Sequence, residues 1–69
     1  MEKIVLRDEY IKLGQALKAA GLVDSGVEAK IVIADGEVLV NGQVEKKKKK
    51  KLHDGHQVEF HGEKILICK

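Results

Sequence analysis

Apolar residues in the first third of the chain recur at the spacing of an α-helix. The short apolar run Ile4–Leu6 predicts a first strand, and Asp8 is placed to cap a following helix. Gly21 stands where a glycine commonly ends such a helix. One apolar stripe of the helix would consist of Tyr10, Leu13, Leu17 and Ala20. The pattern therefore predicts a strand and then a helix that runs up to Gly21.

A second helix has a more explicit start signal. Ser25 is followed three residues later by Glu28, a capping box in which each side chain accepts a hydrogen bond from a free backbone N–H group. The helix would end at Gly36, and its shared apolar face would consist of Val27, Ile31 and Ala34. Only Gly21–Asp24 separates the two helices, so they are expected to pack as neighbours.

The second half of the chain carries strand and turn signals. Asn41-Gly42 lies between apolar-rich runs and predicts a tight hairpin, because a type I′ turn requires positive φ at both central residues. Further turns are expected at Asp54-Gly55 and His61-Gly62, and Ile65–Ile67 is expected to form the last strand. The predicted order is a strand, two adjacent helices and a four-strand antiparallel meander. This is an α+β domain with two N-terminal helices on one face of a small antiparallel sheet.

The length of the chain limits what it can build. Its 69 residues predict one domain spanning residues 1–69. A domain of this size hides only about 60% of the surface that its unfolded chain exposes, which leaves little room for a deep substrate pocket. This counts against an enzyme and against a small-molecule substrate.

The positive charge is concentrated in one segment. The chain has 13 basic and 11 acidic residues, and six of the basic ones form the run Lys46–Lys51. Without that run, the remaining basic residues are outnumbered by the acidic ones. A local cationic patch on a mildly acidic body suits a polyanionic partner that is contacted through one face.

Several classes of protein are disfavoured by what the sequence contains. No apolar stretch approaches the ~20 residues of a membrane span, and the N-terminal residues do not resemble a signal peptide. Cys68 is the single cysteine and cannot form an internal disulfide, which agrees with a reducing compartment. A cytoplasmic protein is therefore expected, with no membrane partner.

Catalytic, metal and base-stacking motifs have little support. No Ser-His-Asp set and no glycine-rich phosphate loop are recognisable. The spacing of His53, His56, His61 and Cys68 matches none of the usual zinc patterns, so we expect neither a metal nor a cofactor. The three histidines are expected in surface turns, where protonation below about pH 6.5 would add positive charge. Tyr10 and Phe60 are the only aromatic residues, and both fit core positions.

Short motifs in the order in which they occur here resemble the S4 RNA-binding domain, also called the alpha-L motif. The resemblance covers roughly three quarters of the chain and is nearest to the small stand-alone bacterial members, which carry Ser-Gly before the Ala-Lys pair. The matching pieces are Leu17–Leu22, Asp24–Gly26, Ala29-Lys30, Ile33, Gly36, Val38, Val40–Gly42, Leu52, Asp54-Gly55 and Val58.

Three positions depart from residues that are frequent in this family. Gly26 stands where many members have an arginine, Gly14 where many have an aspartate, and Gly55-His56 where many have Gly-Asp. The missing arginine removes a phosphate contact from the second helix and makes the lysine run more important.

The resemblance implies a non-catalytic module that binds structured RNA, such as ribosomal RNA or a ribosome-assembly intermediate, and so acts in translation. The lysine run is expected to supply most of the affinity and salt dependence but little specificity, and any preference for a particular RNA would come from the shape of the helix pair. The candidate RNA-binding residues are Lys12, Lys18, Ser25, Gly26, Lys30, Lys46, Lys47, Lys48, Lys49, Lys50 and Lys51.

Two alternative functions remain open at this level. Val40–Gly42 and Asp54-Gly55 also resemble parts of small β-grasp domains, in which case the lysines would meet an acidic protein surface. The adjacent helices argue against that fold, because a β-grasp domain begins with a hairpin. In the second alternative, the chain is an accessory subunit that targets an RNA-modifying enzyme to its RNA. Protein that is retained in a pull-down after nuclease treatment would favour the first alternative over RNA binding.

Overall fold

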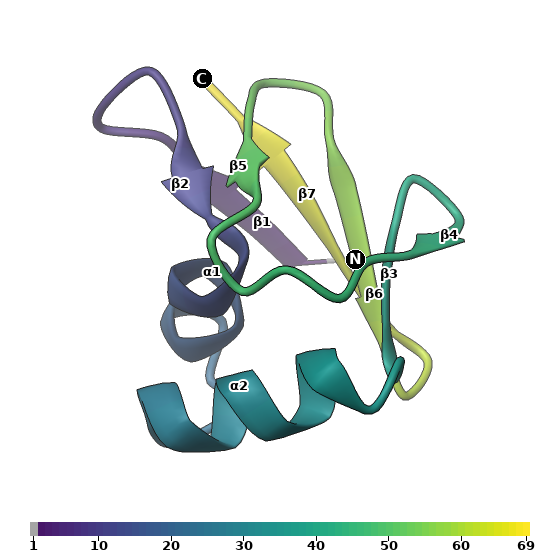
Figure 1. Cartoon of the computed structure of the whole chain (residues 1–69). Helices are drawn as coiled ribbons and strands as arrows, with labels where there is room; N and C mark the ends of the chain where they lie inside the picture. The colour runs from purple at the N-terminus through teal and green to yellow at the C-terminus, as the bar shows by residue number, and fades with distance from the viewer. Residues whose placement is uncertain (1) are drawn as a thin grey trace.

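The computed structural model describes residues 2–69 and places two short helices against a five-stranded sheet (Figure 1). The helices are α1 (Leu13–Ala19) and α2 (Gly26–Ala34). The strands of the main sheet are β1 (Glu2–Val5), β3 (Val38–Val40), β4 (Gln43–Val44), β6 (Gln57–Phe60) and β7 (Glu63–Cys68). A separate two-stranded ladder is formed by β2 (Ile11–Lys12) and β5 (Lys51–Leu52).

The α+β class predicted from the sequence is confirmed, and the connectivity of the sheet is more complex than a meander. The strand order is β1-β7-β6-β3-β4, in which β3, β4, β6 and β7 pair antiparallel. β1 pairs parallel with β7, which makes the sheet mixed. β5 leaves the sheet altogether and pairs antiparallel with β2. The segment between β4 and β5, which holds most of the lysine run, is thereby drawn across to the start of α1.

The core lies between the helices and one face of the sheet. Three cross-strand pairs supply the sheet side, because Val38 lies opposite Phe60, Val40 opposite Val58, and Val58 opposite Ile65. Leu13, Ala16 and Leu17 of α1 and Ala29 and Ile33 of α2 close the core with no exposed surface. Among residues 2–69, no helix is long and apolar enough to cross a membrane.

The first helix begins four residues later than a cap at Asp8 implies, because its N-cap is Lys12. Leu13 is its first residue, Lys12 is the N-cap, and the Lys12 N–H donates to Gln15 Oε1 at 3.1 Å. The Asp8 prediction was wrong because Ile11 and Lys12 pair with Leu52 and Lys51 in a strand ladder, which holds this stretch extended. A pairing across about forty residues of sequence overrides the local helical spacing, as tertiary context often does.

The second helix buries a different face from the one that the sequence pattern indicated. Ala29 and Ile33 are fully buried, whereas Val27 and Ile31 are 70% and 55% exposed. Apolar residues occur almost all round α2, so helical spacing by itself does not select the inner face. The buried face is the one that carries Ala29 and Ile33.

The predicted helix ends and hairpin turns are confirmed. Asn41 and Gly42 have φ values of 51° and 83°, as a type I′ turn requires, and His61-Gly62 repeats this conformation. At the end of α1, the Gly21 N–H donates to the Lys18 carbonyl and the Leu22 N–H to the Leu17 carbonyl, both at 3.0 Å. This pair of bonds is the Schellman arrangement, and the φ of 75° at Gly21 explains why glycine stands there.

Candidate nucleic-acid interface

The lysine run forms a loop that covers the N-terminal end of α1. Lys46–Lys50 lie in the loop, and Lys51 begins β5. The Leu13 N–H donates to the Lys50 carbonyl at 2.8 Å, and the Gly14 N–H donates to the Lys48 carbonyl at 3.0 Å. Two of the free N–H groups that start a helix are thus satisfied by the loop backbone, so the loop is fixed to α1 rather than hanging free.

The side chains of this lysine loop (residues 46–51) point away from the backbone in different directions, as expected for consecutive residues. Lys46 lies against the end of α2, with its Cε 3.6 Å from where a Cβ would stand at Gly36. Lys51 places its Nζ 4.9 Å from the centroid of the Tyr10 ring, within range of a cation–π contact. Lys48 points between the two helices and lies close to both Gly14 and Gly26. The six charges are therefore spread over the surface around both helices.

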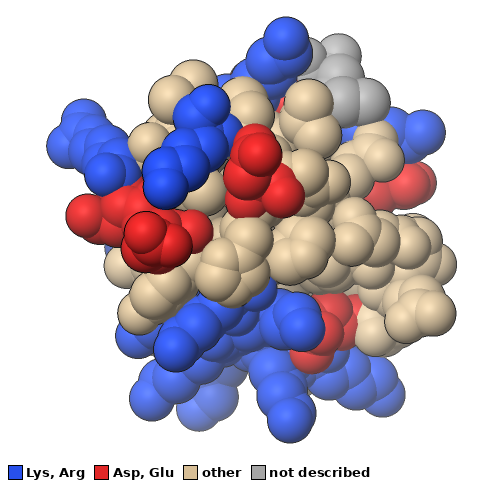
Figure 2. Space-filling model, turned by 90° about the horizontal axis from the view of Figure 1, so that it is seen from above, with Lys and Arg blue, Asp and Glu red and all other residues tan. Residues whose placement is uncertain are grey.

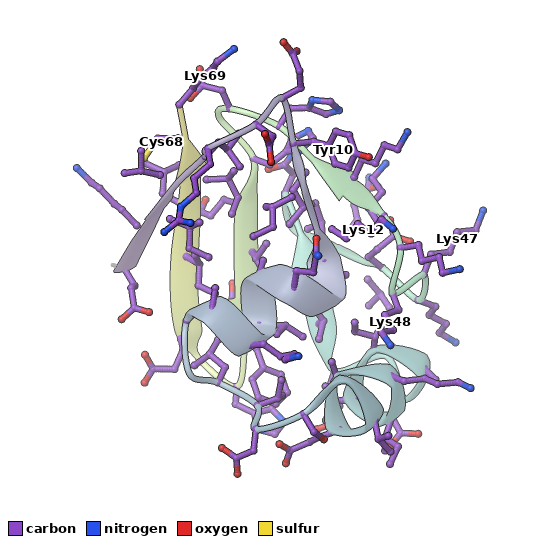
Figure 3. All side chains as sticks on the ribbon, turned by 90° about the vertical axis from the view of Figure 1, so that its left-hand side faces the viewer. Tyr10, Lys12, Lys47, Lys48, Cys68 and Lys69 are labelled. Carbon is purple, nitrogen blue, oxygen red and sulfur yellow. The ribbon has the colours of Figure 1, made fainter. Side chains whose placement is uncertain are left out.

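A groove between α1, the start of α2 and the lysine loop collects much of the predicted site. It has a volume of about 270 Å³. Figure 3 shows Lys12, Lys47 and Lys48 on the same side of the molecule, while Cys68 and Lys69 lie on the other side. We call this feature the basic groove, and its lining residues are Lys12, Gly14, Gln15, Lys18, Gly26, Lys48 and Lys49.

Five of the eleven candidate residues line the basic groove, and the others surround it or serve the fold. Lys30 is an exposed residue on α2 that does not line it. Lys46, Lys47, Lys50 and Lys51 are exposed along the loop and β5. The five that converge come from three separate segments of the chain: Lys12, Lys18, Gly26, Lys48 and Lys49.

The charge of the basic groove is not neutralised by nearby acids. In the described part of the chain, the ion pairs are His61–Glu37 at 2.5 Å and Lys69–Glu9 at 3.9 Å, and neither involves a groove lysine. Lys12 and Lys51 lie directly opposite each other in the β2–β5 ladder, an arrangement of like charges that costs stability. Figure 2 shows Lys and Arg side chains gathered along one edge of the molecule, while elsewhere on that face they mix with acids. Such a surface favours a polyanion.

Ser25 acts as the helix cap that the sequence indicated. The Glu28 N–H donates to Ser25 Oγ at 3.1 Å. The return bond is shifted by one residue, because Glu28 Oε1 accepts from the Asp24 N–H at 2.7 Å instead of from Ser25. Ser25 is exposed and precedes the groove residue Gly26 in the chain, but it does not itself line the basic groove.

Sequence reasoning missed two groove residues and misplaced one aromatic residue. Gln15 stands three residues from both Lys12 and Lys18, a helical spacing that could have placed all three on one face. Gly14 was noted only as a departure from the family. Phe60 is buried as expected, but Tyr10 is 37% exposed because it precedes α1 and lies beside Lys51.

The histidines do not come together with Cys68. The rings of His53 and His56 lie 5.8 Å apart beside Tyr10, whereas the His61 ring stacks on Phe60 and bonds to Glu37. Over residues 2–69, no three His, Cys, Asp or Glu side chains converge in a way that could hold a metal ion.

Comparison with known proteins assigns this chain to a family. The model of the S4 domain matches residues 4–68. This chain belongs to the S4 domain family. The relationship extends over almost the whole chain and agrees with the resemblance seen in the sequence motifs.

Two bacterial proteins are similar to this chain. YbcJ of Escherichia coli (strain K12) is 40% identical over 58 residues, which cover 84% of this chain and 83% of YbcJ. RlbA of Bacillus subtilis (strain 168), whose name describes a probable ribosome maturation protein, is 41% identical over 59 residues, or 86% of this chain and 83% of RlbA.

The solution structure of YbcJ has the same fold. It matches this chain with a TM-score of 0.76 and 36% identity, over 100% of this chain and 89% of the YbcJ chain. Its description assigns YbcJ an alpha-L motif involved in RNA binding. The two adjacent helices and mixed sheet described above are therefore shared with that S4 protein.

Proposed function

We propose that this chain is a non-catalytic module that binds structured RNA, with the phosphate backbone in the basic groove and along the lysine loop. The observation that carries the proposal is the convergence of Lys12, Lys18, Lys48 and Lys49 from separate segments onto one groove without acidic partners. Lysines that neutralise phosphates release the cations condensed on the nucleic acid, which is the main electrostatic source of nucleic-acid affinity.

The fold favours folded RNA over single strands. Proteins that bind single-stranded bases by stacking use exposed aromatic platforms. Here Phe60 is buried, and the ring of Tyr10 is flanked by Lys51 Nζ. The basic groove is instead built on two helices and a loop bonded to them, which suits recognition of shape and phosphate.

The relatives narrow the class of RNA. YbcJ carries a motif described as involved in RNA binding, and RlbA is named for ribosome maturation. We therefore propose ribosomal RNA or a ribosome-assembly intermediate as the partner, and the cytoplasm as the place of action. Membership in the S4 family favours this function over a β-grasp-like protein-interaction module, and the accessory-subunit hypothesis stays a prediction.

Binding to a structured ribosomal RNA fragment should weaken steeply with salt. If the four groove lysines each neutralise one phosphate, the slope of log affinity against log salt is about −3.6, at roughly 0.9 per contact. A rise from about 50 to 200 mM salt then lowers affinity about 150-fold. Filter binding across salt measures this, with an unstructured RNA of equal length as the control. Equal affinity for the two RNAs, or no affinity at low salt, would contradict the proposal.

Two substitutions at Ser25 should separate its capping role from any contact with RNA. Ser25→Ala removes the acceptor for the Glu28 N–H and should lower stability by about 1 kcal/mol. Ser25→Asp keeps a capping oxygen but adds a negative charge beside Gly26, so stability should be retained while RNA affinity falls. Urea denaturation and RNA titration of both variants measure the two effects. Unchanged RNA affinity in Ser25→Asp would place Ser25 outside the interface.

A further inference from the structure

One lysine of the run is held by a glycine on a different element. A Cβ at Gly14 would stand 2.8 Å from Cγ of Lys48, 3.2 Å from its Cε and 3.5 Å from its Cδ. Real Cβ atoms essentially never approach another atom as closely as the first of these distances. The stem of Lys48 therefore lies directly on the backbone of α1, in space that only glycine leaves free.

The stem continues from Gly14 to the start of the second helix. Nζ of Lys48 lies 3.5 Å from where a Cβ would stand at Gly26, the first residue of α2. The Lys48 side chain thus spans the basic groove from α1 to the start of α2. Within the lysine loop, Lys48 and Lys49 are the groove-lining residues, and Lys48 is the one whose stem packs on Gly14.

The backbone of Lys48 cannot easily move to relieve a clash at Gly14. Its carbonyl accepts from the Gly14 N–H at 3.0 Å, and two residues later the Lys50 carbonyl accepts from the Leu13 N–H at 2.8 Å. Both bonds tie the loop to the first turn of α1. A side chain at position 14 would therefore displace the Lys48 side chain rather than the loop.

We propose that Gly14 is a positioning residue for RNA binding, because it fixes the Lys48 ammonium in the basic groove as a phosphate contact. The inference rests on the proposed function and deepens it. It also accounts for the glycine at position 14, where many members of the family have an aspartate, because Gly14 makes room for the stem of Lys48. In this chain, the side chain of Lys48 lies between Gly14 of α1 and Gly26 of α2.

Gly14→Ala separates this role from a role in folding. Alanine is favoured over glycine inside a helix, and the φ of Gly14 is not positive, so the variant should still fold once the Lys48 side chain has turned away from the added methyl group. The slope of log RNA affinity against log salt should nevertheless become less steep by about 0.9. A fourfold rise in salt would then lower the RNA affinity of the variant by a factor about 3.5 times smaller than the factor for the parent. Lys48→Met should show the same change.

The double variant Gly14→Ala/Lys48→Met provides the decisive comparison. If Gly14 acts through Lys48, the double variant should bind no worse than Lys48→Met alone, because the ammonium is already absent. The matched control is the double variant Gly14→Ala/Lys49→Met, in which the losses of RNA affinity caused by the two single substitutions should add. Parent-like affinity and slope in Gly14→Ala, no change in Lys48→Met, or additive effects in the first pair would each overturn the inference.

A failure of the proposed function gives a different result. If the parent protein binds no RNA, the RNA proposal falls. The positioning role then also falls, whatever the contact between Gly14 and the Lys48 side chain. If the parent binds, NMR cross-peaks between the Gly14 Hα and Lys48 Hγ protons of the free protein test the geometry alone. Their absence would overturn the inference while leaving RNA binding by the lysine loop intact.

Discussion

Replacing all six lysines at positions 46–51 with serine is expected to remove much of the salt dependence of RNA binding. Lys48 and Lys49 line the basic groove, so their loss should reduce the slope of log affinity against log salt by about 1.8. A fourfold rise in salt would then lower the RNA affinity of the variant by a factor about 12 times smaller than the factor for the parent. If all six lysines contact phosphate, the reduction reaches about 5. The measured change therefore reports how many lysines of the run meet RNA.

The variant should still fold, because the loop is held by its backbone. The carbonyls at positions 48 and 50 accept the same hydrogen bonds from α1 when the side chains are serine. A matched control removes Lys3 and Lys64, which lie on β1 and β7, away from β4 in the strand order and outside the basic groove. If this control loses as much affinity per charge removed as the loop variant, binding depends on net charge and the groove has no special role.

Ile33→Ala is expected to destabilise the domain severely, whereas Ile31→Ala, two residues earlier on the same helix, is not. Ile33 is fully buried, so truncation leaves a cavity and should cost about 2–5 kcal/mol. A domain of this length has only about 3–10 kcal/mol of stability in total. Urea denaturation followed by circular dichroism should therefore show Ile33→Ala partly unfolded in the absence of denaturant or with a much lower midpoint.

Ile31→Ala is the matched control, with the same residue type on the same helix. Ile31 is 55% exposed, and alanine is the better helix former, so its stability should change by no more than about 0.5 kcal/mol. Equal losses at the two positions, or a larger loss at Ile31, would mean that α2 buries the face indicated by the sequence pattern. The pair therefore tests the orientation of α2 directly.

Features encoded by neighbouring residues could be predicted from the sequence. The Asn41-Gly42 turn, the glycine end of α1 and the Ser25 cap all form as expected, because each depends on side-chain chemistry within a few residues. The alternation of Val58 and Phe60 likewise identified a strand with one buried face. The positive patch was evident because six consecutive lysines need no fold to be recognised.

Features that depend on distant partners could not be predicted in the same way. The start of α1 is set by the β2–β5 ladder and by the loop carbonyls that accept from Leu13 and Gly14. The inner face of α2 is set by its contact with α1, since apolar residues occur on both of its sides. Local spacing carries no information about either partner.

By itself, the sequence determined the α+β class, the turns, the helix pair and the family, together with the presence of a concentrated positive charge. Only the tertiary structure decided where that charge lies relative to the helices. It joins Lys12 and Lys18 of the first helical segment to Lys48 and Lys49 of the loop, and it uses Gly14 to seat one of those lysines. The physical reason is that a groove is a relation among segments far apart in the chain. Its geometry is fixed by the hydrogen bonds and packing that bring those segments together.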